Sequence, residues 1–398
     1  MNNLFGDEFM DDNVRCGFTF KGETFQCRGY TYELISDEEF ERICNLWHTL
    51  PNKSEVLEQM RKFHRGNDNI NKIVKYYYRP IMDKVKKYFD KWSVSDVFEC
   101  KDMLSMFLAR ISKNEKVFSS DNIVDNLDTA FRLGGKGVAS KVSNFPVSTC
   151  DQILRKYNVN NNYYDFSCGW GVRQMCAMRN EINYYGTDPN YELVAKLNEF
   201  NQDYKQVNNT KTETKIYCQG SQVFIPELEN KIGIAFSSPP YFDLEDYRIG
   251  DQSFKPGTTY EQWVNNYLKP TFANIYKYLI FEGYFIVNIK DFNNVPLEQT
   301  TIDTAKEVGF KLYKVEQLSQ GKRLNSTSED KGDLIVDSSE NIYIFVKEGY
   351  EPKVDNGLFG VQEEQEEPQA IKVGTTTRVN RETKEIIKED EIEVVSLW

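Results

Sequence analysis

Histidine is scarce in this sequence of 398 residues, in which His48 and His64 are the only two imidazoles. The shortage argues against hydrolases that rely on a histidine base. No apolar run approaches the roughly 18 residues of a membrane helix, and the start, MNNLFGDEFMDD, lacks the basic and apolar blocks of a signal peptide. We therefore expect a cytoplasmic protein without a membrane partner.

Closely paired cysteines are missing as well. The eight cysteines form no C-x-x-C motif, and their spacing is unlike that of a disulfide scaffold, so free thiols are expected. Cys16, Cys27, Cys44 and His48 offer one possible zinc set, but zinc fingers place their ligands in closer pairs. We expect no metal site.

Positive charge is short overall but concentrated locally. The net charge of −12 argues weakly against a nucleic-acid partner. Residues 351–398 hold 12 acidic and 6 basic side chains, whereas residues 53–92 hold 11 Lys or Arg against 5 acids. The second segment therefore carries an excess of positive charge that the global sum hides.

The first part of the chain, residues 1–125, is predicted to be a mainly helical domain with a small β-hairpin and a possible role in DNA binding. Residues 15–34 alternate apolar and polar side chains, which is typical of a hairpin and a following strand. Ser36 and Glu39 have the spacing of a capping box. Helices are predicted over 37–50, 54–65, 69–92 and 97–112.

The second part, residues 126–349, has a different pattern. Short β-branched or aromatic runs alternate with helical patterns, which predicts an α/β fold with a doubly wound, Rossmann-like sheet and helices on both faces. The last two strands, FKLYKVEQL and NIYIFVK, have no helix between them and should be antiparallel. Residues 350–398 form an acidic tail that we expect to be flexible, although TTTRVNRETKEI has the pattern of a hairpin.

A glycine-containing loop, DFSCGWG, joins a predicted strand to a helix at residues 165–171. Ligands bind at such strand ends in doubly wound sheets, and glycine lets the backbone approach a ligand closely. The loop lacks the full G-x-G-x-x-G of dinucleotide folds. Asp188 follows at the end of the next strand, where a carboxylate can accept hydrogen bonds from both ribose hydroxyls. The simpler interpretation is a tight turn and an exposed acid.

A second strand end carries Ser238-Pro239-Pro240-Tyr241, directly after the apolar run IGIAF. A plain turn would more often use Gly, Asn or Asp. These features together resemble the class I S-adenosylmethionine-dependent methyltransferases and, more narrowly, the DNA methyltransferases of phages and restriction systems that modify N4 of cytosine or N6 of adenine. DFSCGWG is similar to their motif D-x-F-x-G-x-G, and SPPY to their motif [DNS]-P-P-[YFW]. The resemblance covers about residues 131–347.

The resemblance implies S-adenosylmethionine as the cofactor and DNA as the partner. It also implies a set of cofactor-binding residues, comprising Asp165, Ser167, Cys168, Gly169, Gly171, Asp188, Gln219, Ser221, Asn144 and Phe145. Asn144 and Phe145 lie in an upstream loop that would cover the methionine end, and a glycine-rich linker is the alternative for that loop. Gln219 and Ser221 stand where the family often has an acid near the adenine amino group.

The catalytic residues that the resemblance implies are Ser238, Pro239, Pro240 and Tyr241. Methyl transfer to an exocyclic amine is an in-line displacement, so the enzyme mainly has to hold the nitrogen in position. Ser238 offers a hydroxyl acceptor, the prolines preset a carbonyl, and Tyr241 offers a face for a flipped-out base. A stiff turn that ends a strand is the structural alternative.

DNA phosphates would be held by lysine and arginine side chains. The candidates are Lys75, Arg79, Lys86, Lys87, Arg248, Lys255 and Arg323. The first four lie in a segment, 72–92, that is rich in both lysine and tyrosine, and a solvated amphipathic helix is the equally weighted alternative there. Arg248 and Lys255 lie in the long loop that follows SPPY. Loops of that length are often functional, which makes these two residues candidates.

Ser238 tilts the expected target slightly toward N4 of cytosine, since N6-adenine enzymes more often carry Asp or Asn at this position. Two alternatives stay open: a methyltransferase that acts on RNA or on a protein glutamine, and a non-catalytic DNA-binding protein with a relict fold. A cognate restriction endonuclease is a possible partner, or none if the enzyme is an orphan in a bacterial or phage-infected cell.

Overall fold

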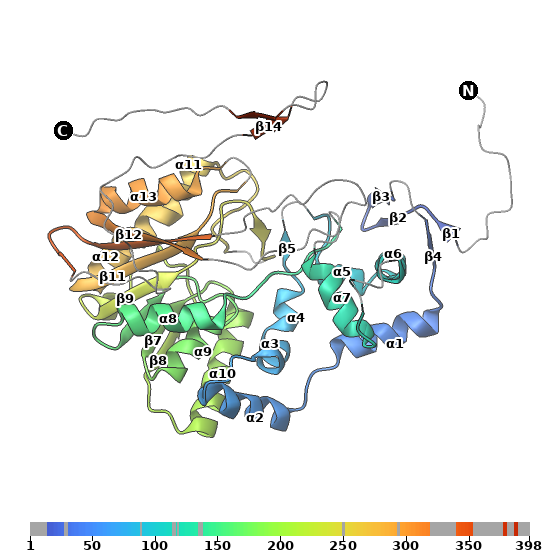
Figure 1. Ribbon diagram of the computed structural model, residues 1–398, viewed down its shortest axis with the longest axis horizontal. Coiled ribbons are helices and arrows are strands. Elements are labelled where there is room, and N and C mark those ends of the chain that lie inside the picture. The colour runs from blue at the N-terminus through green and yellow to red at the C-terminus, as the bar shows by residue number, and fades with distance from the viewer. Residues whose placement is uncertain are drawn as a thin grey trace. The chain divides into compact units, whose positions relative to one another are not determined.

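The computed structural model describes most of the chain (Figure 1). The described residues are 14–27, 31–87, 90–113, 117, 119–133, 138–248, 251–292, 295–318 and 340–352, with the backbone of 377–379 and 386–388. The chain divides into two compact units, Met1–Pro352 and Lys353–Trp398. In the second unit, β14 (Thr377–Val379) pairs antiparallel with β15 (Ile386–Lys388), which is the hairpin that the sequence pattern allows.

The main sheet of the described chain has seven strands in the order β12-β13-β11-β9-β6-β7-β8. Its strands are β6 (Asn162–Asp165), β7 (Asn183–Thr187), β8 (Thr214–Tyr217), β9 (Ile232–Ser237), β11 (Leu279–Ile289), β12 (Phe310–Leu318) and β13 (Glu340–Lys347). The neighbours from β8 to β11 are parallel, whereas β13 is antiparallel to both β11 and β12. The doubly wound sheet and its antiparallel last pair are confirmed.

Helices cover the two faces of this sheet (Figure 1). They are α8 (Val147–Tyr157), α9 (Val172–Arg179), α10 (Tyr191–Asn208), α11 (Tyr260–Trp263), α12 (Lys269–Tyr278) and α13 (Leu297–Val308), with a 3-10 turn at Pro226–Leu228 and a π-helical turn at Val264–Leu268. All six residues of β9 are buried, because a strand in the middle of a parallel sheet is covered on both faces. The apolar run IGIAF is therefore a core strand, as its composition predicts.

The N-terminal region is mainly helical. Its elements are β1 (Val14–Arg15), β2 (Gly17–Phe20), β3 (Glu23–Gln26), β4 (Tyr32–Glu33), α1 (Asp37–His48), α2 (Lys53–His64), α3 (Asn71–Tyr77), α4 (Arg79–Met82), β5 (Lys86–Lys87), α5 (Val94–Val97), α6 (Lys101–Ser112) and α7 (Ile123–Arg132). The hairpin β2–β3 is present, and the Ser36 side chain accepts from the Glu39 N–H at the start of α1. The hairpin agrees with the sequence pattern, whereas only the Ser36 half of the expected capping box is formed, because the Glu39 carboxylate accepts from Arg42.

One long helix over 69–92 is a wrong prediction. The segment is divided into α3, α4 and the short strand β5. Pro80 lies in the first turn of α4, where its missing N–H and fixed φ are tolerated but an unbroken helix from α3 is not. The helix predicted over 97–112 likewise begins later, at Lys101, after the separate turn α5.

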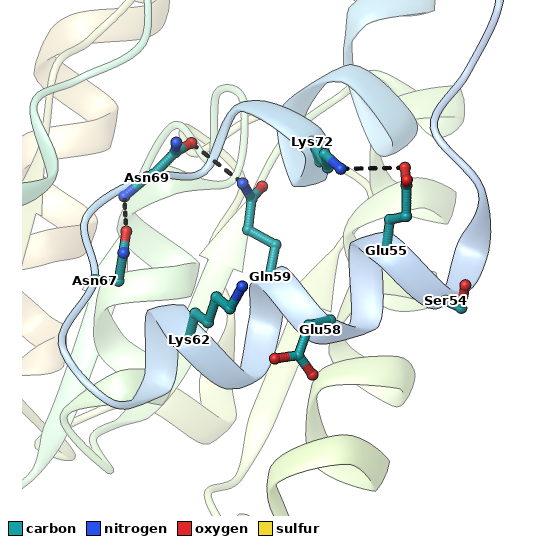
Figure 2. A pocket seen from close by; sticks show the side chains of 8 residues that line it. All are labelled: Ser54, Glu55, Glu58, Gln59, Lys62, Asn67, Asn69 and Lys72. Carbon is teal, nitrogen blue, oxygen red and sulfur yellow. Dashed lines mark hydrogen bonds and ion pairs between the residues drawn. The ribbon is translucent and has the colours of Figure 1, made fainter.

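The N-terminal region packs against α10 of the sheet domain. Lys53 of α2 and Tyr77 of α3 both bond to Asp203 of α10, and the Tyr77 ring meets Phe200 edge-on at 5.7 Å. A polar hollow of about 460 Å³ lies between α2 and α3 (Figure 2). Its lining residues are Ser54, Glu55, Glu58, Gln59, Lys62, Asn67, Asn69 and Lys72, none of which belongs to the strand-end loops.

The described residues contain neither a metal-binding cluster nor a membrane-spanning helix. Nowhere in that part of the chain do three or more His, Cys, Asp or Glu side chains gather as a metal site would require. Among the same residues, no helix combines the length and the apolar character needed to cross a membrane.

Candidate functional site

The site lies where the strand order of the sheet reverses. β7 and β9 flank β6 on opposite sides, so the chain crosses from one half of the sheet to the other at the carboxyl end of β6. Ligands of doubly wound sheets bind at this switch point. The three predicted strand-end features, around Asp165, Asp188 and Ser238, therefore meet at one edge.

The glycine loop depends on backbone conformations that favour glycine. Gly169 and Gly171 have φ angles of 53° and 73°, and Gly171 caps α9. A Cβ on Gly171 would lie 2.6 Å from the Tyr78 Oη, so the position is also too tight for a side chain. Tyr78 comes from the N-terminal region and is fully buried, and its hydroxyl has no hydrogen-bond partner among the described residues.

Asp165 is inside the protein rather than at the surface of the site. Its side chain is 0% exposed and accepts hydrogen bonds from Arg173 Nε and Tyr184 Oη, each at 3.0 Å. Its Oδ1 also accepts from the Ser167 N–H at 3.3 Å. Direct contact with a cofactor is therefore the wrong expectation for Asp165, which instead fixes the loop that begins with it.

Arg173 is a residue that the sequence analysis missed. Its Nη2 donates to the carbonyl of Ser167 and, at 3.1 Å, to Ser237 Oγ, while its Nε binds Asp165. Burial alone would lower the pKa of this guanidinium, but Asp165, together with Tyr163 and Tyr184, outweighs burial and raises it. The side chain thus ties the glycine loop to the end of β9, just before Ser238. Nothing in the helical pattern VRQMCAM singles it out.

Asp188 and the glycine loop are next to each other. The Asp188 carboxyl accepts from the Asn190 N–H at 3.0 Å, and the Gly169 N–H is also close enough to lower its pKa. Burial is the larger influence and raises the pKa of Asp188 to about 7. The loop is held against the same strand end by the Cys168 N–H, which donates to the Thr187 carbonyl at 3.1 Å.

The Cys168 side chain points into the core. It is 1% exposed, and a Cβ on Gly186 would lie 2.5 Å from its Sγ. Burial raises the pKa of this thiol well above its ordinary value. The Cys168 sulfur therefore does not face a ligand, and the Cys168 N–H is engaged by Thr187. Ser167 is half-buried, and its carbonyl is occupied by Arg173 and by Ser237 Oγ.

The upstream loop contributes an unpartnered acceptor. Asn144 Oδ1 is buried and has no hydrogen-bond partner among the described residues. The neighbouring Phe145 packs edge-on against Phe236 of β9, with ring centroids 5.4 Å apart. Because Phe236 is 0% exposed, the loop is fixed on the strand that leads to Ser238. Phe236 itself is not available for a base to stack on.

The loop after β8 gives a mixed result. Ser221 is 2% exposed and bonds through Oγ to Thr271 Oγ1 at 2.9 Å, so its side chain does not face a ligand as expected. Gln219 is half-buried, and its Nε2 donates to the Val223 carbonyl at 3.1 Å. This bond leaves the Gln219 amide oxygen as one acceptor in the loop, and Gln222 Oε1 is a second acceptor, buried and without a partner among the described residues.

Ser238 has a defined hydrogen-bond direction. Its Oγ donates to Asn288 Oδ1 at 3.1 Å, and Asn288 Nδ2 donates to the Asn341 carbonyl at 3.2 Å. A main-chain carbonyl can only accept, so the amide group of Asn288 must face Asn341 with its nitrogen and Ser238 with its oxygen. The Ser238 proton is thereby engaged, and its lone pairs are left for a donor. Asn288, a polar residue within the buried strand β11, was not predicted.

The rest of the Ser-Pro-Pro-Tyr segment is partly buried. Pro239 is buried, and Pro240 and Tyr241 are half-buried at the sheet edge. Phe242 is anchored in an aromatic cluster, with its ring centroid 5.0 Å from Phe254 and 5.3 Å from Tyr260. Tyr241, like Phe242, packs against the apolar core of the sheet domain, and its stacking on a base stays a prediction.

The predicted DNA contacts are not all available. Arg79 is a wrong prediction, because it is 8% exposed and its guanidinium lies 3.6 Å from the centroid of the Trp47 ring. Asp83 and Asp128 lie 3.7 Å and 3.6 Å from its nitrogens. Lys75 is half-buried, and its pKa is lowered by burial and by the Arg79 charge.

The other candidates differ in their surroundings. Lys86 and Lys87 form β5, which pairs with β10 (Glu245–Asp246), a strand that begins four residues after Tyr241. Arg248 Nη2 forms an ion pair with Asp96 at 2.7 Å. Lys255 is exposed, and Arg323 lies outside the described residues. Among the described residues of 72–92, the basic side chains therefore do not form one continuous face.

Known proteins resemble this chain in fold only. No protein family and no curated protein match the sequence. Similar solved structures include a TehB-like SAM-dependent methyltransferase from Corynebacterium glutamicum, with 16% identity over 52% of this chain and 90% of that chain and a TM-score of 0.34. A SAM-dependent methyltransferase from Clostridium acetobutylicum has 12% identity over 61% and 100%, with a TM-score of 0.32. The [4+2]-cyclase SpnF has 14% identity over 44% and 60%, with a TM-score of 0.32. Likenesses this distant say nothing about the substrate.

Proposed function

We propose that this protein transfers a methyl group from S-adenosylmethionine to the exocyclic amino group of a flipped-out base in DNA. The observation that carries the proposal is the convergence of the glycine loop, Asp188 and Ser238 at the switch point of a seven-stranded sheet whose last strand pair is antiparallel. A tight turn would explain the glycine loop alone, but the exposed acid of the simpler interpretation is not found, because Asp188 is buried. Their meeting at one edge favours a single ligand that spans them.

The residues at this edge fit the cofactor. The backbone at Gly169 and Gly171 would cradle the methionine part, and the unpartnered Asn144 Oδ1 is an acceptor suited to its ammonium group. Asp188 would accept from the ribose hydroxyls, which offer the hydrogen bonds that favour its charged form. Bound there, the sulfonium compound supplies the electrophilic methyl group.

The chain's own contribution is to position the amine. Ser238 Oγ donates its hydrogen bond to Asn288, so its lone pairs can accept one N–H of an exocyclic amine. The fixed φ of Pro239 and Pro240 orients the adjoining backbone carbonyl as a second acceptor. Tyr241 would hold the flipped base by stacking, which contributes about 1–3 kcal/mol per base. No general base is needed, because the proton can leave after transfer.

The target is an amine rather than a carbonyl oxygen. Because the Ser238 hydroxyl can only accept, it can bind the amino group of cytosine or adenine. It cannot bind the keto oxygen of thymine, which is also an acceptor. Ser238 in the first position of the motif favours N4 of cytosine slightly over N6 of adenine. RNA bases and a glutamine side chain present similar amines, so they are the outcomes to be distinguished.

The test is product analysis. The purified protein is incubated with methyl-labelled S-adenosylmethionine and unmethylated DNA, RNA or protein extract, and the digested products are analysed by mass spectrometry. We expect N4-methylcytosine or N6-methyladenine from DNA, and neither with the Ser238→Ala variant. Label in RNA or glutamine alone would overturn the DNA proposal. Calorimetry with the cofactor separates a relict fold, which would give no saturable heat.

A further inference from the structure

The segment that follows the Ser-Pro-Pro-Tyr turn, residues 241–248, is held from two sides. We refer to it as the target loop. On the sheet side, Phe242 is inserted among Phe254, Tyr260 and Trp263. Gln252, just beyond the loop, accepts from the Tyr247 N–H and donates to Asp246. Further contacts come from the N-terminal region, which lies outside the doubly wound sheet.

The first of these contacts is a two-stranded ladder. β10 of the target loop pairs antiparallel with β5, so that Lys87 is opposite Glu245 and Lys86 is opposite Asp246. Opposite charges on directly facing residues stabilise such a pair. The ladder is short, however, and an isolated pair of two-residue strands has little stability of its own. A further contact is needed to hold it.

Asp96 supplies that contact. Its side chain is 1% exposed, and its carboxylate binds Arg248 Nη2 at 2.7 Å and Lys21 Nζ at 2.6 Å. The same carboxylate accepts from the Ser93 N–H at 2.8 Å, which fixes it at the start of α5. Burial alone would raise the pKa of Asp96, but Arg248, Lys21 and Ser93 hold it well below its ordinary value. A buried acid that is fixed by its own helix is a rigid anchor for an arginine from another part of the chain.

The target loop is continuous with the Ser-Pro-Pro-Tyr turn, because Tyr241 belongs to both. Between Asp246 and Arg248 lies Tyr247, whose hydroxyl donates to Glu245 at 2.8 Å. Burial raises the pKa of the Tyr247 phenol, and the charges of Glu245 and Asp188 add to the rise. Movement of Arg248 would therefore move a segment that leads directly back to the turn of the proposed site.

We propose that Asp96 is a positioning residue through which the N-terminal region holds the target loop over the site. Arg248 transmits the restraint, and Glu99, which contacts Lys21 at 2.9 Å but not Arg248, does not take part. The predicted role of Arg248 as a phosphate contact would compete with Asp96 for the guanidinium, whose side chain is 37% exposed. The catalytic consequence of the restraint rests on the proposed function, whereas the restraint itself does not.

The experiment measures loop opening and turnover separately. Amide hydrogen exchange of peptides that cover 241–248 is recorded for the full chain, for Asp96→Asn and for Arg248→Gln. Glu99→Gln is the matched control, and Ser93→Ala tests the cap of α5 without removing the Arg248 pair. Single-turnover methyl transfer to DNA and the KM for DNA are then measured for the same variants.

We expect exchange in the target loop to become about tenfold faster in Asp96→Asn and in Arg248→Gln, with Glu99→Gln within about twofold of wild type. Turnover should fall by a similar factor in both variants, while the KM for DNA changes little. Arg248→Lys should recover part of the loss, because it keeps the charge but offers a single contact.

Three results bear on the proposal differently. Unchanged exchange in both variants would overturn it, whatever the activity. Opposite effects on DNA affinity, tighter for Asp96→Asn and weaker for Arg248→Gln, would also overturn it, because Arg248 would then be a phosphate ligand. If the wild type transfers no methyl group at all, the proposed function fails, and the exchange data still decide whether Asp96 holds the loop.

Discussion

Two parts of this molecule carry strong sequence patterns, and they behave differently in the structure. The strand-end loops around Asp165, Asp188 and Ser238 come together at one edge as their spacing predicts. The lysine- and tyrosine-rich segment 72–92 does not form the basic helix that its periodicity suggests. Arg79, in its middle, is buried between Trp47 and two carboxylates.

The difference lies in how far the decisive contacts reach. A glycine at positive φ or a proline pair acts on the neighbouring backbone, so its effect can be predicted from the local sequence. A lysine or arginine has no such local effect, and its partner is chosen by packing. Lys84, for example, binds Glu192 on α10, and Lys53 binds Asp203. Charge patterns therefore predicted poorly where backbone patterns predicted well.

The sharpest test of the strand-end site is Arg173→Met. Removing the guanidinium leaves Asp165 0% exposed and without its ionic partner. Breaking a buried pair in this way costs about 3–5 kcal/mol of unfolding free energy, measured by urea denaturation. Arg155→Met on the exposed side of α8 is the control and should cost less than about 1 kcal/mol. Equal losses would contradict the role assigned to Arg173.

The basic segment is tested by Arg79→Met. We expect a loss of about 2–3 kcal/mol of unfolding free energy, because Asp83 and Asp128 lose a buried cation, and no specific loss of DNA affinity. Lys84→Met, in the same segment but with its side chain 51% exposed, should change stability by less than about 1 kcal/mol. A stable Arg79→Met variant with weak DNA binding would restore the original prediction.

Tyr241→Ala addresses the base-holding role. Loss of stacking should raise the free energy of the transition state by about 1–3 kcal/mol, which lowers turnover roughly 5- to 150-fold. The affinity for the cofactor should be nearly unchanged. Tyr241→Phe keeps the ring and should retain most of the activity. Single-turnover rates and calorimetry with the cofactor give the two readouts. An equal loss of both would mean that the residue only supports the fold.

The buried acid of the site predicts a stability that depends on pH. The pKa of Asp188 is raised to about 7 by burial, so the folded chain binds a proton that the unfolded chain has already lost. Unfolding free energy from this group therefore falls as pH rises from about 4 to about 7. Asp188→Asn should be about 1–3 kcal/mol more stable than wild type at pH 8, and the difference should shrink toward pH 4.

The same variant should bind S-adenosylmethionine at least about tenfold more weakly at pH 8, because an amide replaces the acceptor of two hydroxyls. For the wild type, affinity should weaken from pH 8 to pH 6 as the carboxyl becomes protonated. Calorimetry at the two pH values gives the comparison. A stability difference that does not grow with pH would contradict the raised pKa.

The smallest expected effect concerns Lys255. This exposed side chain should contribute one phosphate contact, so Lys255→Ala should lower the slope of log affinity against log salt by about one and weaken DNA binding uniformly across sequences. Fluorescence anisotropy over a salt series measures the slope. Lys62→Ala, in the polar hollow of Figure 2, is the control and should leave the slope unchanged.

Much of the fold and part of the site follow from the sequence. The alternation of strands and helices, the antiparallel last pair, and the positions of Gly169, Gly171 and Asp188 depend on composition and local backbone preference. Such preferences act within a few residues of their source. For that reason the doubly wound sheet and the strand ends that carry the candidate site could be predicted without knowing any distant contact.

The supporting contacts were decided by the tertiary structure alone. Arg173 binds Ser237, Asn288 binds Ser238 and Asp96 binds Arg248 across 64, 50 and 152 residues of sequence. No periodicity encodes such pairs, because a buried polar group takes whichever partner packing brings within reach. The sequence therefore determined the positions of the strand ends that carry the candidate site, and the packing of distant segments determined what holds them there.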